Sequence, residues 1–301
     1  MKKIVLVALT ALMFSCNNSD DTPDVRNPSA PGLAYALSEK DFNTTYNSLR
    51  SAVQSNSEIK FIEEIDHKAN AQSVNKDLRN TKLIIFGNPK LGTALLKKNQ
   101  LAGLDLPQKL LVFQDGDNNV FVSFNSTSYL AARHNVGGAN TIQQINSALT
   151  GLAVNATGGI VSENATAGIT SSEGIISIKS NNDFITTYFN LRNAIADKSE
   201  LKLISQIDHQ ANAQSVGETL DPTRLIIFGN TKLGTPLIQS SQTAGIDLPQ
   251  KMLVWEDASG DTFISYNRPE FIKSRHGING NDDVIANIGN TLSSLAVSAA
   301  N

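Results

Sequence analysis

The sequence predicts an α+β protein that contains two copies of a small domain, each an antiparallel sheet with helices on one face. The first observation is a repeat: IDHKANAQSV at Ile65 recurs as IDHQANAQSV at Ile207, an offset of 142 residues. The second is that β-branched and aromatic runs in each copy predict strands. The third is that the predicted helices bracket these strands instead of alternating with them, which favours an antiparallel sheet.

Each copy is predicted to run strand, helix, strand, strand, short helix, strand, strand, helix. The first helix is expected over residues 41–55 and 182–198, because apolar residues recur there at helical spacing behind a capping Asp or Asn. In the next strand, alternation places Ile59, Phe61, Ile65 and His67 on one face. If the repeated residues are structural, DHxANAQSV is expected to be a strand end followed by a turn whose Asn and Gln satisfy backbone groups.

The third, fourth and fifth strands of each copy are also predicted from local patterns. Residues 83–86 form a β-branched run, and LLVF and VFVSF flank a turn that contains Asp115 and Gly116, which predicts a hairpin. The segment SYLAARH, repeated as EFIKSRH, is expected to form a short helix that ends at His134 and His276.

The repeat also sets the domain boundaries. We expect a first domain over residues 33–154, a linker of small and polar residues over 155–173, and a second domain over 174–297. Duplication makes packing of the two repeats on each other a reasonable expectation.

The N-terminus resembles a bacterial lipoprotein signal. Two lysines precede an apolar run from Ile4 to Phe14, and MFSC ends at Cys16, the one cysteine of the chain. We therefore expect a signal peptide over 1–16, a lipid on Cys16 that anchors the protein to a membrane in the cell envelope, and a flexible tether over 17–32. The alternative is an ordinary secretory peptide with an incidental cysteine.

Composition excludes one class of partner. The 301 residues carry a formal charge of −3, and the isoelectric point is near 5.8. Because there is no basic stripe, binding to nucleic acid through its phosphates is not expected.

The segment GNPKLGT resembles part of a phosphate-binding loop, but the lysine that should follow its second glycine is replaced by threonine. One interpretation is anion binding by helix amides, with the candidates Gly87, Lys90, Gly92, Thr93, Gly229, Lys232, Gly234 and Thr235. The other is structural: Thr93 and Thr235 cap a helix, with Pro236 at its first position.

The four histidines form two pairs under the repeat and are the strongest candidates for a site. If His67 and His134 converge, they could supply two metal ligands, with Asp115 or, in the second copy, Asp257 as a third. They could instead line a small-molecule site, or be buried imidazoles bonded to backbone carbonyls or to a nearby asparagine. The ligand-binding candidates are His67, Asn70, Asp115, Asn125, Arg133, His134, His209, Asn212, Asp257, Asn267, Arg275 and His276.

Several motifs together resemble the domain of unknown function 302 family. DHxANA, FGNPKxGT, LDLPQKLLVxxD, VSxN and YLxxRH occur in order in the first copy, and close variants follow the same order in the second. The resemblance implies a compact α+β domain similar to the TATA-binding-protein-like fold. The resemblance also implies that the characteristic residues of the family correspond, in the first copy, to His67, Asn70, Phe86, Gly87, Asn88, Gly92, Thr93, Asp105, Pro107, Asp115, Asn125, Arg133 and His134. The second copy departs from the pattern at Thr231, where the family has proline. The first copy has Phe113-Gln114 where the second keeps the family-like Trp255-Glu256.

Three functional hypotheses follow. The repeats could be non-catalytic modules that bind a small polar or amphipathic ligand, which is the reading we favour. They could be metal-dependent or histidine-based hydrolases, although no G-x-S-x-G elbow is present. They could also be structural or interaction domains in which the repeated residues only stabilise the fold. The sequence identifies no cofactor.

Overall fold

A computed structural model describes residues 28–301 of the chain. The predicted signal peptide, the lipidation of Cys16 and most of the predicted tether lie outside these residues. Within 28–301 no helix combines the length and apolar character that a membrane crossing requires.

The first repeat follows the predicted order of elements, with two additional short helices and one additional short strand. Its elements are β1 (Leu33–Leu37), α1 (Phe42–Ser55), β2 (Lys60–Asp66), α2 (His67–Ser73), β3 (Thr81–Gly87), α3 (Pro89–Leu96), the 3-10 helix η1 (Gln100–Leu104), β4 (Gln108–Gln114), β5 (Val120–Asn125), α4 (Thr127–His134), α5 (Ile142–Thr157) and β6 (Val161–Glu163). The short helix predicted to end at His134 is present as α4, and the predicted hairpin is β4–β5.

The second repeat has the same plan. Its elements are β7 (Ile175–Lys179), α6 (Phe184–Ala196), β8 (Lys202–Asp208), α7 (His209–Gln214), β9 (Thr223–Gly229), α8 (Thr231–Ser240), the 3-10 helix η2 (Gln242–Ile246), β10 (Gln250–Glu256), β11 (Thr262–Asn267), α9 (Pro269–Arg275) and α10 (Asp282–Ala300).

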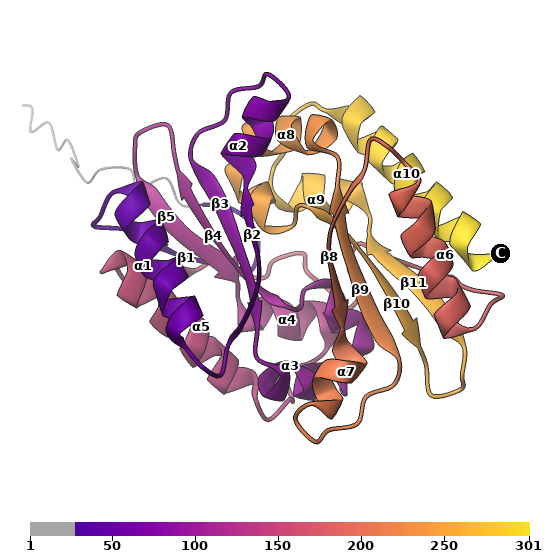
Figure 1. The fold of residues 1–301 in the computed structure, drawn as a ribbon. Coiled ribbons are helices and arrows are strands. Elements are labelled where there is room, and N and C mark those ends of the chain that lie inside the picture. Colours follow the sequence, from indigo (N-terminus) through magenta and orange to yellow (C-terminus); the bar gives the residue numbers. More distant parts are fainter. Residues whose placement is uncertain (1–27) are drawn as a thin grey trace, which may run out of the picture.

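The strands form two antiparallel sheets, as the sequence predicts. Their orders are β2-β3-β4-β5-β1-β6 and β7-β11-β10-β9-β8. Helices α1 and α5 pair on one face of the first sheet, and α6 and α10 pair on one face of the second (Figure 1). The fold is therefore α+β in two repeated domains, with the helices of each sheet on one face.

The remaining faces of the two sheets meet in a second apolar core. This inter-sheet core includes Ile65, Leu83 and Leu111 from the first repeat and Ile207, Leu225 and Leu253 from the second. The 3-10 helices cross between repeats, because η1 contacts β9 and β10 while η2 contacts β3 and β4. The molecule thus has four layers, with the sheets inside and the helices outside (Figure 1).

The predicted single face of the second strand is wrong because each copy contains a β-bulge. The register of β2 against β3 shifts between Phe61 and Glu63. An extra residue in a strand reverses the side-chain alternation beyond it. Phe61 consequently packs in the core under the helices, whereas Ile65 lies in the inter-sheet core. Residue 67 is brought to the interface between the repeats by this bulge.

Both predicted irregular segments contain ordered structure at one end. The last residues of the predicted tether belong to the fold, because Ala30 is fully buried and the Pro31 carbonyl accepts a hydrogen bond from Arg275 Nε at 3.1 Å. In the predicted linker, α5 continues to Thr157 and β6 pairs with β1. Glycine-rich and polar composition did not reveal this edge strand.

Candidate functional site

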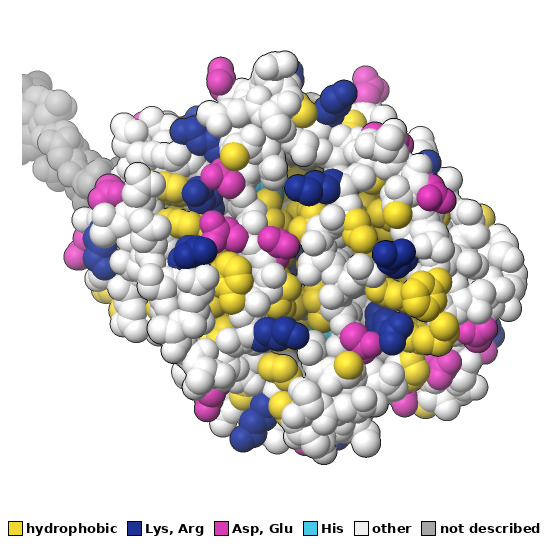
Figure 2. Space-filling view, viewed as in Figure 1, with side chains coloured by type: hydrophobic (Ala, Val, Ile, Leu, Met, Phe, Trp, Pro, Cys, Tyr) yellow, Lys and Arg dark blue, Asp and Glu magenta, His cyan; other side chains and the backbone are white. Residues whose placement is uncertain are grey.

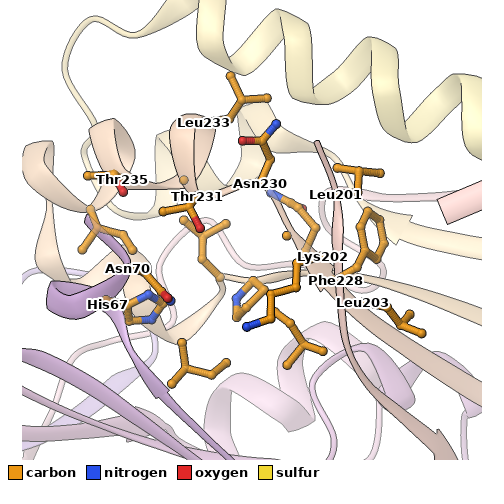
Figure 3. Close-up of a pocket in the computed structure, with 18 of the residues that line it drawn as sticks. His67, Asn70, Leu201, Lys202, Leu203, Phe228, Asn230, Thr231, Leu233 and Thr235 are labelled. Atoms are coloured by element: carbon orange, nitrogen blue, oxygen red, sulfur yellow. The ribbon is translucent and has the colours of Figure 1, made fainter. Parts of the chain in front are cut away.

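Two cavities lie between the repeats, and they are equivalent under the 142-residue offset. Pocket A has a volume of about 250 Å³, and the second repeat supplies most of its wall; the first repeat contributes the end of β2 and the start of α2. Pocket B has a volume of about 120 Å³ and is built mostly from the first repeat. His209 and Asn212 of the second repeat complete pocket B, as His67 and Asn70 complete pocket A (Figure 3).

The DHxANA motif places this histidine and asparagine. Asp66 ends β2 and caps α2, because its Oδ1 accepts the Ala69 amide at 2.9 Å, and it also pairs with Lys82 at 3.1 Å. His67 and Asn70 then lie three residues apart in the first turn of α2, on one side of the helix. A strand end followed by a turn was predicted here; the structure has a capped helix whose first turn reaches the other repeat.

The histidines in the pockets are neutral at pH 7. Burial lowers the pKa of His67 to about 4, although the bond to Gly245 and the nearby Asp66 carboxylate oppose this shift. His67 Nε2 donates to the Gly245 carbonyl oxygen of η2 at 3.2 Å, which leaves Nδ1 as an acceptor. Burial also lowers the pKa of His209 to about 4, and its Nε2 has no hydrogen-bond partner within residues 28–301.

The interior of pocket A is apolar, and few polar groups enter it. The apolar wall consists of Leu201, Leu203, Phe228, Leu233, Ile238, Leu248, Ile288 and Leu292. Gln250 is 9% exposed, and its Nε2 has no partner among the described residues. Gln108 occupies the equivalent position in pocket B, is 8% exposed, and also has an unpartnered Nε2. Each pocket is therefore lined by a glutamine whose buried amide nitrogen has no hydrogen-bond partner among residues 28–301.

The GNPKLGT segments form part of both pockets, but not as predicted. Gly87, Gly92 and Thr93 line pocket B, and Gly229, Gly234 and Thr235 line pocket A. The exposed side chains of Lys90 and Lys232 line neither pocket.

The interpretation of Thr93 and Thr235 as helix caps is wrong. The caps are Asn88 and Asn230, whose side chains accept backbone amides of the first helical turn. The helices start earlier than expected because asparagine satisfies a terminal amide directly after the strand. Pro236 consequently lies inside α8 instead of at its first position.

Charged side chains surround the mouth of pocket A. Figure 2 shows hydrophobic side chains gathered in the hollow between the repeats, with acidic and basic groups around it. Two of the three acidic residues that line the pocket are in ion pairs: Glu64 with Arg50 at 2.6 Å and Asp66 with Lys82 at 3.1 Å. The third, Glu63, lies with them in the part of the wall that the first repeat contributes. The exposed Lys202 lies in the part that the second repeat contributes.

The second pair of histidines lies in a different place, in a buried network of charges. His134 Nε2 contacts Asp105 Oδ2 at 2.7 Å, and Arg133 contacts the same oxygen at 2.8 Å. Arg133 also donates to Asn267 Oδ1 of the second repeat at 2.8 Å and to the Glu173 carbonyl at 3.0 Å. Burial alone would raise the pKa of Asp105, but the guanidinium and the imidazole outweigh it and hold this pKa well below its usual range.

The second repeat repeats the network with one added bond. Arg275 joins Asp247 to Asn125 of the first repeat, with both contacts at 2.8 Å, and His276 Nε2 lies 2.8 Å from Asp247 Oδ2. The other ring nitrogen of His276 is 2.9 Å from the Thr243 hydroxyl. Leucine replaces this threonine at position 101, and the corresponding nitrogen of His134 has no partner in the described chain.

Two buried lysines, which sequence reasoning missed, belong to this network. Lys109 lies 3.9 Å from the Asp105 carboxylate, and Lys251 donates to the Asp247 carbonyl at 3.1 Å. Burial and the neighbouring charge of Lys109 lower the pKa of Lys251 to about 7. The unpartnered Gln108 and Gln250 were missed as well. The only indication in the sequence was that this glutamine and this lysine both recur in the segment DLPQK, which the two repeats share.

The two acidic residues proposed as third ligands shape hairpin turns. Asp115 Oδ1 accepts the amides of Asp117 and Asn119 at 2.9 and 2.8 Å, and Asp257 does the same for Ser259 and Asp261. His67 and His134 therefore belong to separate constellations, a pocket and a charge network. Over residues 28–301 no three His, Cys, Asp or Glu side chains gather in a way that could hold a metal ion.

Comparisons with known proteins bear on the family and the fold. The family model described as "Domain of unknown function DUF302" matches residues 34–152 and again 176–295. A solved structure titled "Crystal structure of uncharacterized conserved protein DUF302 from Bacillus stearothermophilus" covers 42% of the chain and 98% of its own, at 15% identity and a TM-score of 0.39.

Partial similarity also links the chain to curated proteins of a different description. It is 41% identical over 91 residues to "Fluoride-specific ion channel FluC 1" of Brucella suis biovar 1 (strain 1330), which is 30% of this chain and 36% of that protein. The same identity and length relate it to "Fluoride-specific ion channel FluC 2" of Brucella melitensis biotype 1 (strain ATCC 23456 / CCUG 17765 / NCTC 10094 / 16M), of which 34% is covered. The chain thus spans about a third of the length of these relatives.

Proposed function

The chain belongs to the domain of unknown function DUF302 family over both of its repeats, and from this premise we propose that it is a non-catalytic binding protein with two small-molecule sites. One observation carries the proposal: each pocket is completed by a histidine and an asparagine of the opposite repeat. If these residues only stabilised the fold, nothing would require them to border a cavity. Apolar cavities with a few polar groups are the usual form of small-ligand sites.

The neutral histidines fit binding better than hydrolysis. His67 uses Nε2 to hold the Gly245 carbonyl, and within residues 28–301 no carboxylate bonds to its ring to orient it as a general base. His134, which does contact a carboxylate, is fully buried in the network between the repeats. A group in that position cannot reach a substrate in either pocket.

We further propose that the protein acts in the cell envelope, held to a membrane by a lipid on Cys16. The support for this is the pair of lysines followed by an apolar run that ends in MFSC, after which the sequence becomes polar. A soluble ligand-binding domain on a tether is compatible with such an anchor. Labelling of cells with a radioactive or clickable fatty acid, with Cys16→Ser as the control, tests it: the proposal requires label on the natural protein and none on the variant.

Native mass spectrometry of the purified protein tests the binding function. The natural protein is expected to retain a small molecule that an Asn70→Ala/Asn212→Ala variant loses. These asparagines suit the test because they are partly exposed in the pockets and their side chains make no hydrogen bond to other described residues. Retention of the same mass by a folded variant, or an empty natural protein that also fails to bind an added library of small amphipathic compounds, would argue against the proposal.

A further inference from the structure

We propose that pocket A binds an aliphatic carboxylate, with the alkyl chain against its apolar wall and the carboxylate at the Gln250 amide. This inference rests on the binding function proposed above and specifies its ligand. Three features of the pocket carry it: its volume, its unused buried donor, and the distribution of charge around it.

The volume selects pocket A over pocket B. An apolar cavity of about 150 Å³ in a protein core is large enough to hold benzene. Pocket A, at about 250 Å³, exceeds this size, whereas pocket B, at about 120 Å³, falls below it. Pocket A can therefore hold a short alkyl chain and its head group, and pocket B is too small for the same molecule.

The wall of pocket A identifies the body of the ligand as aliphatic. Its apolar side chains come from four separate parts of the second repeat: Leu203 of β8, Phe228 of β9, Leu233 of α8 and Leu292 of α10. They offer dispersion contacts and no hydrogen bonds over most of the interior. A sugar or a nucleotide would leave its polar groups unsatisfied against such a wall, at a cost of several kcal/mol each.

The buried donor identifies the head group as an acceptor. Gln250 Nε2 is enclosed and has no partner in the part of the chain that the structure describes. A buried donor without a partner is costly, so a ligand oxygen in the pocket that the Gln250 amide turns to meet would regain that free energy on binding. An ammonium group would instead place one donor against another.

The surrounding charge favours a carboxylate among the possible acceptors. The N-terminus of α8, a helix of ten residues, borders the pocket at Thr231 and carries the positive end of the helix dipole. Lys202 lies in the same wall. Glu64 and Asp66, which the first repeat contributes, are held by Arg50 and Lys82, which reduces their repulsion of an anion.

The histidines allow a direct test, because the chain has four and only His67 borders pocket A. Two-dimensional NMR of the ¹⁵N-labelled imidazoles would be recorded while hexanoate or hexylamine, which share an alkyl chain, is added to the whole protein. Hexanoate is expected to shift the His67 resonance and to leave those of His134 and His276 in place. Hexylamine is expected to bind at least about tenfold more weakly.

Variants at equivalent positions separate the pockets. Gln250→Leu removes the amide without loss of volume and is expected to weaken hexanoate binding by about tenfold or more, since hydrogen bonds to charged groups are the stronger ones. Gln108→Leu makes the same change in pocket B and is expected to leave the affinity unchanged. Leu233→Trp is expected to block binding, whereas Leu91→Trp, its equivalent in pocket B, is not.

The outcomes distinguish this inference from the function on which it rests. Equal binding of hexanoate and hexylamine, or no effect of Gln250→Leu, would overturn the carboxylate assignment and leave a binding pocket. A response of His209 in place of His67 would overturn the choice of pocket A. If neither compound shifts any imidazole while native mass spectrometry finds another ligand lost from the asparagine variant, the inference fails and the proposed function stands.

Discussion

Replacement of Arg133 by methionine tests whether the buried charge network holds the two repeats together. Arg133 is fully buried, and its guanidinium joins Asp105 of the first repeat to Asn267 of the second. It also lies 4.4 Å from the ring centre of Phe271 in the second repeat. The variant keeps most of the side-chain volume but removes the charge and all three hydrogen-bonding nitrogens.

The expected loss of stability is large. Without the guanidinium, the Asp105 carboxylate remains buried beside His134, with Lys109 at 3.9 Å as its closest remaining cation. Breaking a buried ion pair by removal of one partner costs about 3–5 kcal/mol. Because most domains are stable by only about 5–15 kcal/mol, the variant is expected to fold with a much lower denaturation midpoint.

Urea unfolding followed by tryptophan fluorescence is the appropriate assay. The chain contains one tryptophan, Trp255, which lies in β10 of the second repeat and packs on the inter-sheet core. Arg133 lies in the first repeat. A shift of the Trp255 transition would therefore show that a change in one repeat destabilises the other, as docking through Asn267 requires.

A matched control is another ion pair that joins the repeats at the surface. Lys97 and Glu218 are 2.8 Å apart, and each side chain is about half exposed. Lys97→Met is expected to cost less than about 1 kcal/mol, because water already solvates both charges. The reasoning would be refuted if Arg133→Met cost no more than Lys97→Met, or if it left the Trp255 transition in place.

Two further predictions follow from burial. First, burial lowers the pKa of His67 and His209 to about 4, so the folded state binds fewer protons than the unfolded chain between pH 6.5 and about 4. The contribution of each histidine to the free energy of unfolding is fully present above pH 6.5. It falls by about 1.4 kcal/mol per histidine for each pH unit below that value. Urea titrations at pH 7.5 and 5.5 measure this slope, and a His67→Gln/His209→Gln variant with an unchanged slope would contradict the assignment. Second, Leu111→Ala in the inter-sheet core is expected to cost about 2–5 kcal/mol, whereas Ile185→Ser on the half-exposed face of α6 stays within about 0.5 kcal/mol. Equal midpoints for these two variants would show that the sheets do not depend on each other's apolar faces.

The sequence alone was sufficient to predict the class of the fold. The strands, the bracketing helices and the duplication all arise from local patterns, because alternation, helical spacing and capping involve residues close together in the chain. The first helix, expected at 41–55, is observed as Phe42–Ser55. One local feature that misled was the β-bulge near Ile62, since an extra residue in a strand changes no propensity and yet reverses the faces beyond it.

The sequence also pointed to the residues of the candidate site, but not to their grouping. Repetition drew attention to His67, Asn70 and His134, and the natural assumption was that residues of one copy act together. The structure separates them: His67 and Asn70 border a pocket of the second repeat, while His134 lies in the buried network with Asp105. Gln250 remained unnoticed, because a glutamine becomes informative only when its burial and missing partner are known.

The amino-acid sequence by itself determined that there are two equivalent α+β domains and which side chains they hold in common. Only the tertiary structure decided that each pocket takes its histidine and asparagine from the opposite repeat. The physical reason is that the sheets bury their remaining apolar faces against each other, and this packing brings Asn70 to the same cavity as Thr235 of the other repeat. Contacts between residues so far apart in the chain depend on how whole surfaces dock, which no local pattern encodes.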